Sequence, residues 1–187
     1  MEKYYNDYRL NNKTKEIQLA AVKRDGYSIQ YIINPSEEIQ LEAVKQDGLL
    51  IQYINNPSEK VQLEVVKDAG HSIKYIFNPS EEVQLEAVKN NGESIQFIDS
   101  PSEKVQLEAV KQDGCSIQYI TNPSEKVQLE AVKNDIYSIH YINNIDNIIN
   151  KYYNYELYKY LDDLYYPFTK EFKKSYNYKK YLLEKNI

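Results

Sequence analysis

The stretch Pro101–Asn122, PSEKVQLEAVKQDGCSIQYITN, decides the fold of this chain, because nearly the same 22 residues stand directly before it and directly after it. All five glycines and five of the six prolines occupy equivalent positions in these repeats. Self-similarity at a fixed period is typical of repeat architectures. Aligned on the proline, units one to six begin at Lys13, Pro35, Pro57, Pro79, Pro101 and Pro123, and unit six ends at Asn144.

Each unit is predicted to begin with a helix whose start is marked by a polar cap. In unit two, Asn34 is a good N-cap, and Pro35 suits the first helical position because its missing N–H is not needed there. Glu37 follows Asn34 at the spacing of a capping box. The alternative is a start at Ser36, with acidic residues then favouring the positive end of the helix dipole.

The same helix is predicted to end at Gly48, because glycine takes the left-handed conformation at little cost. A second, shorter helix is expected over residues 50–54. A strand over these residues is the alternative, since Ile and Tyr favour sheets and a unit of this length would then be similar to a leucine-rich repeat. The helix caps, and the lack of that repeat's Leu/Asn ladder, favour the helix.

One helix pair cannot bury its own apolar face, whereas stacked pairs share a continuous core. The sequence therefore predicts an all-α fold: an α-solenoid of six 22-residue two-helix repeats over residues 13–144, roughly 50–60 Å long for helices packed about 8–10 Å apart. Residues 1–12 are predicted to form an N-terminal cap or half repeat. Residues 145–187, which are rich in Tyr and Lys and have helical periodicity, are predicted to form a C-terminal helical cap. Unit six already departs from the pattern at Ile136, where a glycine is expected.

Composition excludes several classes of protein. With 42% hydrophobic residues the chain is too apolar to be disordered, and with a net charge of -5 it is not a polybasic nucleic-acid binder overall. A single cysteine excludes an intramolecular disulfide and fits a reducing compartment. The sequence has no apolar segment typical of a signal peptide or a membrane span. We therefore expect a cytoplasmic protein that does not contact a membrane.

The chain contains no arrangement of residues that is typical of catalysis or metal binding. His71 and His140 lie far apart, without a neighbouring ligand at metal-site spacing. Cys115 has no base in its motif, which argues against a nucleophile. The glycines are 22 residues apart and do not form a phosphate loop. We expect no enzyme activity, no cofactor and no metal.

The wording NPSEEVQLEAVK, residues 78–89, followed by SIQ and an aromatic residue, resembles a short helical repeat of unknown function found in bacterial and bacteriophage proteins. The resemblance covers residues 13–144 and implies a solenoid in the style of HEAT repeats. It also implies a role in host takeover: a phage-encoded, anti-CRISPR-like inhibitor of a defence complex, acting in the host cytoplasm. The Tyr-rich tail lies outside the resemblance.

Some positions are the same in every unit and are interpreted as scaffold. The leucine row is expected in the core, and the glutamine row is expected to bond backbone groups between stacked units. The lysine row could follow phosphates, but a glutamate three residues earlier in units two to six favours ordinary solvated ion pairs. The leucines are Leu19, Leu41, Leu63, Leu85, Leu107 and Leu129; the glutamines are Gln18, Gln40, Gln62, Gln84, Gln106 and Gln128; the lysines are Lys23, Lys45, Lys67, Lys89, Lys111 and Lys133.

Two rows vary freely between units, and we interpret them as candidates for partner binding. Aromatic and apolar side chains at variable surface positions are typical of binding hot spots, and simple drift at turn positions is the alternative. The residues after the glycine are Tyr27, Leu49, His71, Glu93, Cys115 and Tyr137. The residues before the closing Asn or Ser are Ile33, Asn55, Phe77, Asp99, Thr121 and Asn143.

The C-terminal tail interleaves Lys and Tyr, a mixture that can bind single-stranded nucleic acid by charge and stacking. The residues concerned are Lys173, Lys174, Tyr176, Tyr178, Lys179 and Lys180. The alternatives are a capping helix with a basic outer face, or a contact in a homodimer, so monomer and homodimer both stay open. The leading hypothesis is a non-enzymatic solenoid that binds a protein, such as a host complex. The alternative is a nucleic-acid-binding solenoid that uses the lysine row and the tail.

Overall fold

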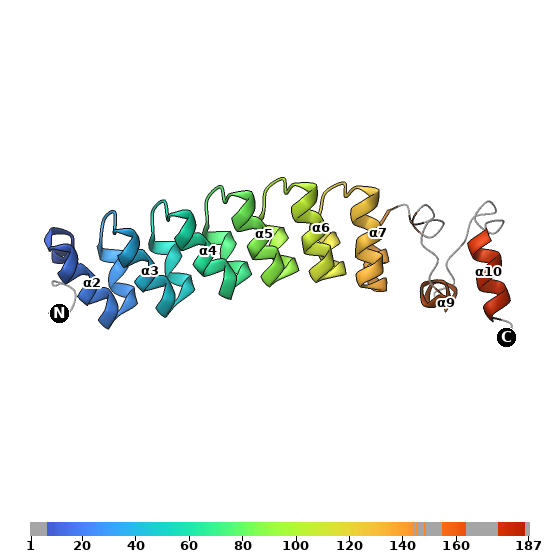
Figure 1. Ribbon diagram of the computed structural model, residues 1–187, viewed down its shortest axis with the longest axis horizontal. Coiled ribbons are helices and arrows are strands. Elements are labelled where there is room, and N and C mark those ends of the chain that lie inside the picture. Colours follow the sequence, from blue (N-terminus) through green and yellow to red (C-terminus); the bar gives the residue numbers. More distant parts are fainter. Residues whose placement is uncertain (1–6, 144, 146–147, 149–154, 164–175, 186–187) are drawn as a thin grey trace.

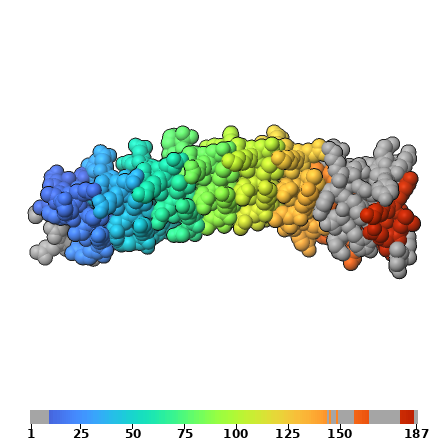
Figure 2. All heavy atoms as spheres, in the orientation of Figure 1, coloured from blue at the N-terminus to red at the C-terminus, as the bar shows by residue number. Residues whose placement is uncertain are grey.

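The chain forms a row of stacked helical units in a computed structural model that describes residues 7–143, 145, 148, 155–163 and 176–185. Within these ranges every regular element is a helix, and the predicted all-α solenoid is confirmed. The two ends of the chain lie at opposite ends of an elongated body (Figures 1 and 2). The elements are η1 (Asp7–Asn12), α2 (Lys15–Arg24), η2 (Gly26–Tyr31), α3 (Glu37–Gln46), η3 (Gly48–Tyr53), α4 (Glu59–Asp68), η4 (Gly70–Tyr75), α5 (Glu81–Asn90), η5 (Gly92–Phe97), α6 (Glu103–Gln112), η6 (Gly114–Tyr119), α7 (Glu125–Asn134), η7 (Ile136–Tyr141), α9 (Tyr155–Asp163) and α10 (Tyr176–Lys185), where η marks a 3-10 helix.

The second helix of each unit is a six-residue 3-10 helix, neither an α-helix nor a strand. In η2 the Asp25 carboxylate accepts a hydrogen bond from the Tyr27 N–H at 3.1 Å, which caps the start of the helix. Residues three apart eclipse one another in a 3-10 helix. Gly26 and Ile29 are therefore both buried, while Tyr27 and Gln30 both face solvent.

The left-handed residue of each junction is an asparagine or serine, and the prediction that glycine takes this conformation is wrong. Asn34 has φ 52°, so it is not the N-cap. The N-cap is Ser36, and α3 begins at Glu37, which confirms the alternative start. Asparagine tolerates the left-handed region because its short polar side chain can bond locally. The equivalent left-handed residues are Asn56, Asn78, Ser100 and Asn122.

Glycine is required for a different reason: the next unit comes very close. A Cβ built on Gly70 would lie 2.4 Å from the backbone oxygen of Ala87, and one on Gly114 would lie 2.5 Å from that of Ala131. Real Cβ atoms do not approach backbone oxygens this closely. Ile136, which stands at the glycine position of unit six, is half-buried against the core.

The core is a continuous column of valine, isoleucine and alanine side chains. Ile39, Ala43, Val88 and Val110 are examples with no solvent exposure. The leucine row is only partly buried and packs against this column from outside. The prediction that these leucines lie in the core is therefore wrong in its extent, because they contact the core without being fully buried in it. Small and β-branched residues at the centre let neighbouring helices approach closely.

In units two to six the glutamine row stabilises the junction within a unit, whereas Gln18 of unit one donates to the Leu10 carbonyl of the preceding η1 at 3.0 Å. In unit two the Gln40 side-chain N–H donates to the Pro35 carbonyl at 2.8 Å, and the same bond recurs in units three to six at 2.8–2.9 Å. Between units, the N-cap serine links successive helices. Ser102 donates to Glu81 at 2.6 Å while its oxygen accepts from the Val105 N–H at 3.3 Å.

Short elements flank the six units. At the N-terminal end η1 has the same six-residue 3-10 form as the repeats, and the Asn11 side chain accepts a hydrogen bond from the Ile33 N–H at 2.5 Å. Beyond unit six, Leu157 and Leu161 of α9 are buried. The rings of Tyr158 and Tyr181 lie 5.3 Å apart, which joins α9 to α10. No helix in the described ranges combines the length and apolar character that crossing a membrane requires.

Candidate partner-binding surface

Six aromatic residues form a row along the solenoid, one at the last position of each 3-10 helix. We call this row the aromatic stripe: Tyr31, Tyr53, Tyr75, Phe97, Tyr119 and Tyr141. Tyr31 is half-buried, and the other five are 36–47% exposed. A position that is aromatic in every unit reads as core from the sequence, and the sequence analysis did not select it. This position is exposed because the second element of each unit is a 3-10 helix. A prediction of an α-helix or a strand does not reveal that exposure.

The variable residues after each glycine lie against this stripe. The Tyr27 ring is 6.3 Å from the Tyr53 ring of the next unit, and the His71 ring is 5.5 Å from that of Phe97. Tyr27, Leu49 and Tyr137 are 47–57% exposed, while the equivalent residues His71, Glu93 and Cys115 are half-buried. The structure thus brings one predicted row together with the aromatic row that the sequence analysis missed.

In units three and four, His71, Lys74 and Glu93 place ionisable side chains beside the aromatic stripe. The His71 Nδ1 atom lies 3.0 Å from the Asn91 side-chain nitrogen, and His71 Nε2 lies 4.0 Å from a Glu93 carboxylate oxygen. The Lys74 ammonium lies over the rings of Tyr75 and Phe97, 4.9 Å and 5.9 Å from their centres. Elsewhere the exposed positions of the 3-10 helices carry glutamine, histidine, tyrosine or leucine, while the carboxylates Asp25, Asp47, Asp113 and Asp135 cap the starts of η2, η3, η6 and η7.

The second predicted row lies in the loops that join units. Phe77 is 95% exposed and Ile33 is 71% exposed, and the remaining members of the row, Asn55, Asp99, Thr121 and Asn143, are exposed as well. At unit six this row and the aromatic stripe meet at a cavity of about 280 Å³, which is lined by Tyr141 of the stripe and Asn143 of the row. Full exposure of an apolar side chain such as Phe77 is unfavourable in water, which favours partner binding over drift at that position.

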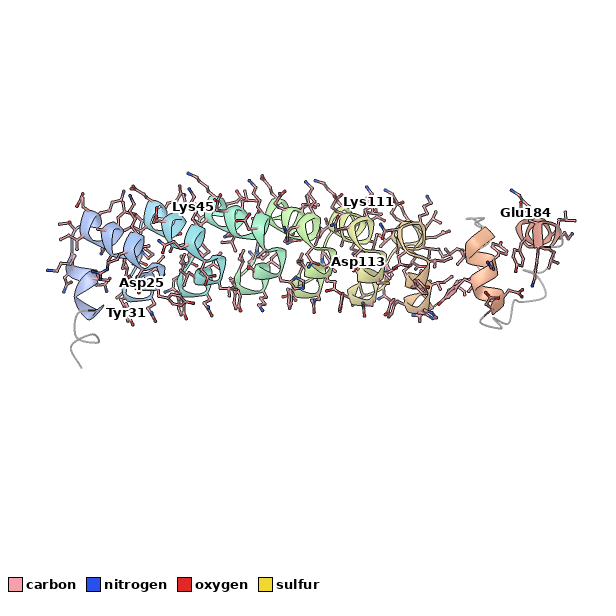
Figure 3. All side chains as sticks on the ribbon, turned by 90° about the horizontal axis from the view of Figure 1, so that it is seen from below. Asp25, Tyr31, Lys45, Lys111, Asp113 and Glu184 are labelled. Carbon is pink, nitrogen blue, oxygen red and sulfur yellow. The ribbon has the colours of Figure 1, made fainter. Side chains whose placement is uncertain are left out.

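The lysine row lies on the opposite edge of the solenoid. Figure 3 shows Lys45 and Lys111 along one edge and Tyr31 toward the other. All six lysines are exposed, and Lys89 and Lys133 lie 3.8 Å and 3.9 Å from the glutamates three residues earlier. Pairing of this kind is the ordinary interpretation of the lysine row.

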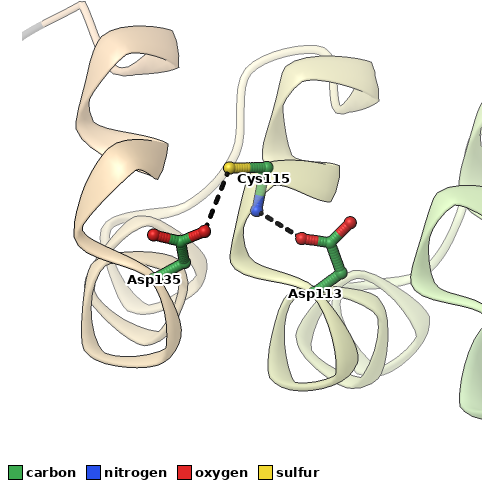
Figure 4. A group of neighbouring side chains, drawn as sticks. All are labelled: Asp113, Cys115 and Asp135. Atoms are coloured by element: carbon green, nitrogen blue, oxygen red, sulfur yellow. Dashed lines mark hydrogen bonds between the residues drawn. The ribbon is translucent and has the colours of Figure 1, made fainter.

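Cys115 sits between the carboxylates of Asp113 and Asp135 (Figure 4). Its thiol donates to Asp135 at 3.4 Å, and its N–H donates to Asp113 at 2.9 Å. Burial, and then the hydrogen bond to Asp135, raises the pKa of the Cys115 thiol to about 11. The thiol is therefore neutral near pH 7 and a poor nucleophile.

Potential metal-ligand atoms of Cys115, Asp113 and Asp135 lie within 4.8 Å of one another. The carboxylates have a structural explanation, however. Asp25 and Asp47 cap their 3-10 helices in the same way in units that have no cysteine. The cluster is accounted for by helix capping.

The tail residues predicted to bind nucleic acid are only partly described. Lys173 and Lys174 lie outside the described residues, and Tyr176 and Tyr178 are described only as part of the α10 backbone. Lys179 is exposed, and Lys180 lies 3.9 Å from Glu184 on the same helix. The described part of the tail contributes one exposed lysine and one paired lysine to that hypothesis.

Comparison with known proteins gives one match. A family described as a domain of unknown function (DUF4116) matches residues 80–124, which cover two repeats in units four to six. No curated protein and no solved structure matches the chain.

Proposed function

We propose that this chain is a non-enzymatic solenoid that binds a protein partner along the aromatic stripe and the variable residues beside it. The observation that carries the proposal is a row of one aromatic side chain per unit along the 3-10 helices, exposed in five of the six units. Tyrosine supplies a large contact area with a polar tip and is enriched in binding hot spots. A repeat array turns such positions into an extended surface.

The charge distribution favours a protein over a nucleic acid as partner. Phosphate binding needs unpaired Lys or Arg along the path of the backbone. Lys74 is the cation of the stripe, and it lies over the rings of Tyr75 and Phe97. The lysine row lies on the other edge and alternates with glutamates.

A host defence complex is the narrower version of this proposal. It is supported by the resemblance of the repeat to bacterial and bacteriophage proteins. In that version the chain would act in the host cytoplasm as an inhibitor that covers a surface of the complex.

The test is an affinity purification from bacterial lysate, with and without nuclease, using three forms of the tagged chain. One form is unchanged, one carries Tyr53→Ser, Tyr75→Ser and Tyr119→Ser, and the third is a matched control on the opposite edge. That control carries Lys45→Ser, Lys67→Ser and Lys111→Ser. Circular dichroism first establishes that all three forms keep the same helix content.

We expect a stoichiometric protein that survives nuclease, is retained by the lysine variant and is lost from the tyrosine variant. Binding of that protein should weaken little between low and high salt, because an apolar interface releases few counterions. Retention by the folded tyrosine variant would contradict the proposed surface. Recovery of nucleic acid alone, lost at high salt or from the lysine variant, would assign the function to the lysine row.

A further inference from the structure

Most contacts between neighbouring units are closed on the 3-10 side by a side-chain amide. Between units three and four, Asn90 accepts from the Gly70 N–H at 2.8 Å and donates to the Lys67 carbonyl at 2.7 Å. Asn134 makes the same two bonds, at 2.8 Å and 2.7 Å, between units five and six. Between units one and two, Gln46 accepts from the Gly26 N–H at 2.9 Å and donates to the Val22 carbonyl, one residue before the lysine position, at 2.7 Å.

The contact between units four and five lacks the amide bridge in the described part of the chain but is still tightly packed. A Cβ on Gly92 would lie 2.6 Å from the Ala109 carbonyl oxygen, and Gly92 is buried. Backbone packing alone therefore closes this contact. The contact between units four and five is therefore the appropriate comparison for the remaining contact, which is the one between units two and three.

Between units two and three, both features are missing. Gly48 is half-exposed, and a Cβ built on it would meet only Val65 Cγ1, at the ordinary distance of 3.6 Å. Asp68 stands where Gln46 and Asn90 stand, and a carboxylate cannot donate to a carbonyl. Ala69 replaces the Asp or Asn that caps the 3-10 helix in the other units, and it offers no side-chain cap.

One residue explains the wider spacing. Val65 occupies the position that Ala43, Ala87 and Ala109 occupy in other units. In units four, five and six the small alanine lets its own carbonyl reach the preceding glycine, whereas in unit two the Leu50 and Gln46 side chains lie against Gly26. The two extra methyl groups of Val65 stand in that space instead, so the backbone of unit three is held away from Gly48.

The other side of the same contact is intact. The Glu37 carboxylate lies 3.5 Å from the Lys60 ammonium, and the neighbouring Ser58 hydroxyl lowers the pKa of the Glu37 carboxyl. These groups are at the N-terminal ends of α3 and α4. The contact is thus fastened at the α-helix starts and loose at the 3-10 helices, which is the geometry of a hinge that opens on the side of the aromatic stripe.

We propose that the contact between units two and three is a hinge, and that units one and two move as one block relative to units three to six. Opening increases the separation between Tyr53 and Tyr75 and leaves the spacing within each block unchanged. The stripe would then adapt to a partner at one defined place. The hinge rests on the contacts between units and not on the proposed function, so its test needs no partner.

The test is a pair of distance measurements between spin labels, in a Cys115→Ser background. Labels on cysteines at Gln52 and Gln96 span the hinge and one closed contact. Labels at Lys74 and Gln118 occupy the same register and span two closed contacts. Both pairs lie roughly 16–20 Å apart, since they are two helix spacings from each other. We expect a broader distance distribution, extending to longer distances, for the pair that spans the hinge.

The double substitution Val65→Ala with Asp68→Asn restores the alanine and the amide of the closed contacts. We expect it to narrow the Gln52/Gln96 distribution to the width of the Lys74/Gln118 distribution, which itself stays unchanged and reports that the fold is intact. Equal widths in the unmodified chain would overturn the hinge. An unchanged broad distribution in the folded double variant would overturn it as well, and Val65→Ala alone gives the same comparison if the double variant does not fold.

Discussion

At the scale of single residues, the glycines show how one residue type serves different contacts. None has a positive φ, so the backbone conformation does not require glycine. The space beside them decides instead, because a Cβ on Gly92 would lie 2.6 Å from the Ala109 carbonyl oxygen, whereas one on Gly48 has room. The same substitution of glycine by alanine should therefore have opposite effects on stability at Gly92 and at Gly48.

Gly92→Ala should lower the free energy of unfolding by about 1–3 kcal/mol, because its Cβ would collide with the Ala109 carbonyl and force the units apart. Gly48→Ala should raise it by about 0.4–1 kcal/mol, since alanine restricts the unfolded chain and its Cβ has room. Urea unfolding followed by circular dichroism measures both. Equal destabilisation by the two variants would show that the contact at Gly48 is as tight as the others.

The thiol of Cys115 offers a chemical test of its surroundings. With a pKa of about 11, about one thiol in a thousand is ionised at pH 8, so alkylation by iodoacetamide should be slow in the folded chain and much faster in urea. Asp135→Asn removes the negative charge beside the thiol and should lower this pKa and speed alkylation, as measured by mass spectrometry across pH.

The raised pKa also affects stability. The folded state favours the neutral thiol, so its contribution is complete at neutral pH and is lost as the pH rises from about 9, the ordinary value, to about 11. Cys115→Ser should remove this component of alkaline destabilisation. Fast alkylation of the folded chain at pH 8 would contradict the assigned environment.

At the scale of elements, the junction before each α-helix depends on one left-handed residue. Four of the five junctions use asparagine, and the fifth uses Ser100 with φ 50°. A left-handed residue other than glycine or asparagine costs roughly 1–2 kcal/mol. The five junctions therefore differ in strain while their hydrogen bonds stay the same.

Ser100→Asn should stabilise the chain by a few tenths of a kcal/mol, and Asn78→Ala should destabilise it by about 1 kcal/mol. Asn78→Gly serves as the control, because glycine adopts the same φ freely and should change stability little. Thermal unfolding of the three variants measures the differences. If Asn78→Gly destabilised the chain as much as Asn78→Ala, the junction would need the asparagine side chain and not the backbone conformation.

The elements also show which expectations a sequence supports. The period of 22 residues fixed the number of units, the all-helical class and the stacked arrangement, because these follow from apolar periodicity and caps. The 3-10 form of the second helix was not predictable from six residues rich in Ile and Tyr. Without it, Tyr53 and its equivalents cannot be placed on the surface, so the aromatic stripe was missed while the variable Tyr27 beside it was found.

The roles of Gly48 and Asn34 were assigned the wrong way round for a physical reason. Both residue types tolerate positive φ, and the sequence does not indicate which of two such residues turns the chain. The decision depends on how close the next unit comes, which is a property of the stacked array. The looser contact at Val65 could not be predicted for the same reason. The two extra methyl groups of valine affect the spacing only when the neighbouring unit is stacked against them.

At the scale of the whole molecule, the array should behave as a line of nearest neighbours. Deleting residues 101–122 removes unit five and brings Gly92 against Ala131, an equivalent of its present neighbour Ala109. We expect a folded chain with proportionally less helix and a lower Tm, as measured by circular dichroism and calorimetry. Deleting residues 101–111 instead removes half a unit, breaks the register and should prevent folding of the C-terminal part. Loss of folding in the full-unit deletion would contradict independent units.

The substitution at Ile136 has a consequence for how many molecules can join. A surface that stacks on its own kind has no inherent limit, and a head-to-tail contact of this type grows into a filament when nothing closes it. Glycine at this position would present the close-contact surface that the inner units use. Ile136 stands there instead, and α9 packs on the same end of unit six, with the Tyr160 ring 5.2 Å from that of Tyr137, so the array ends at unit six and does not continue into another copy.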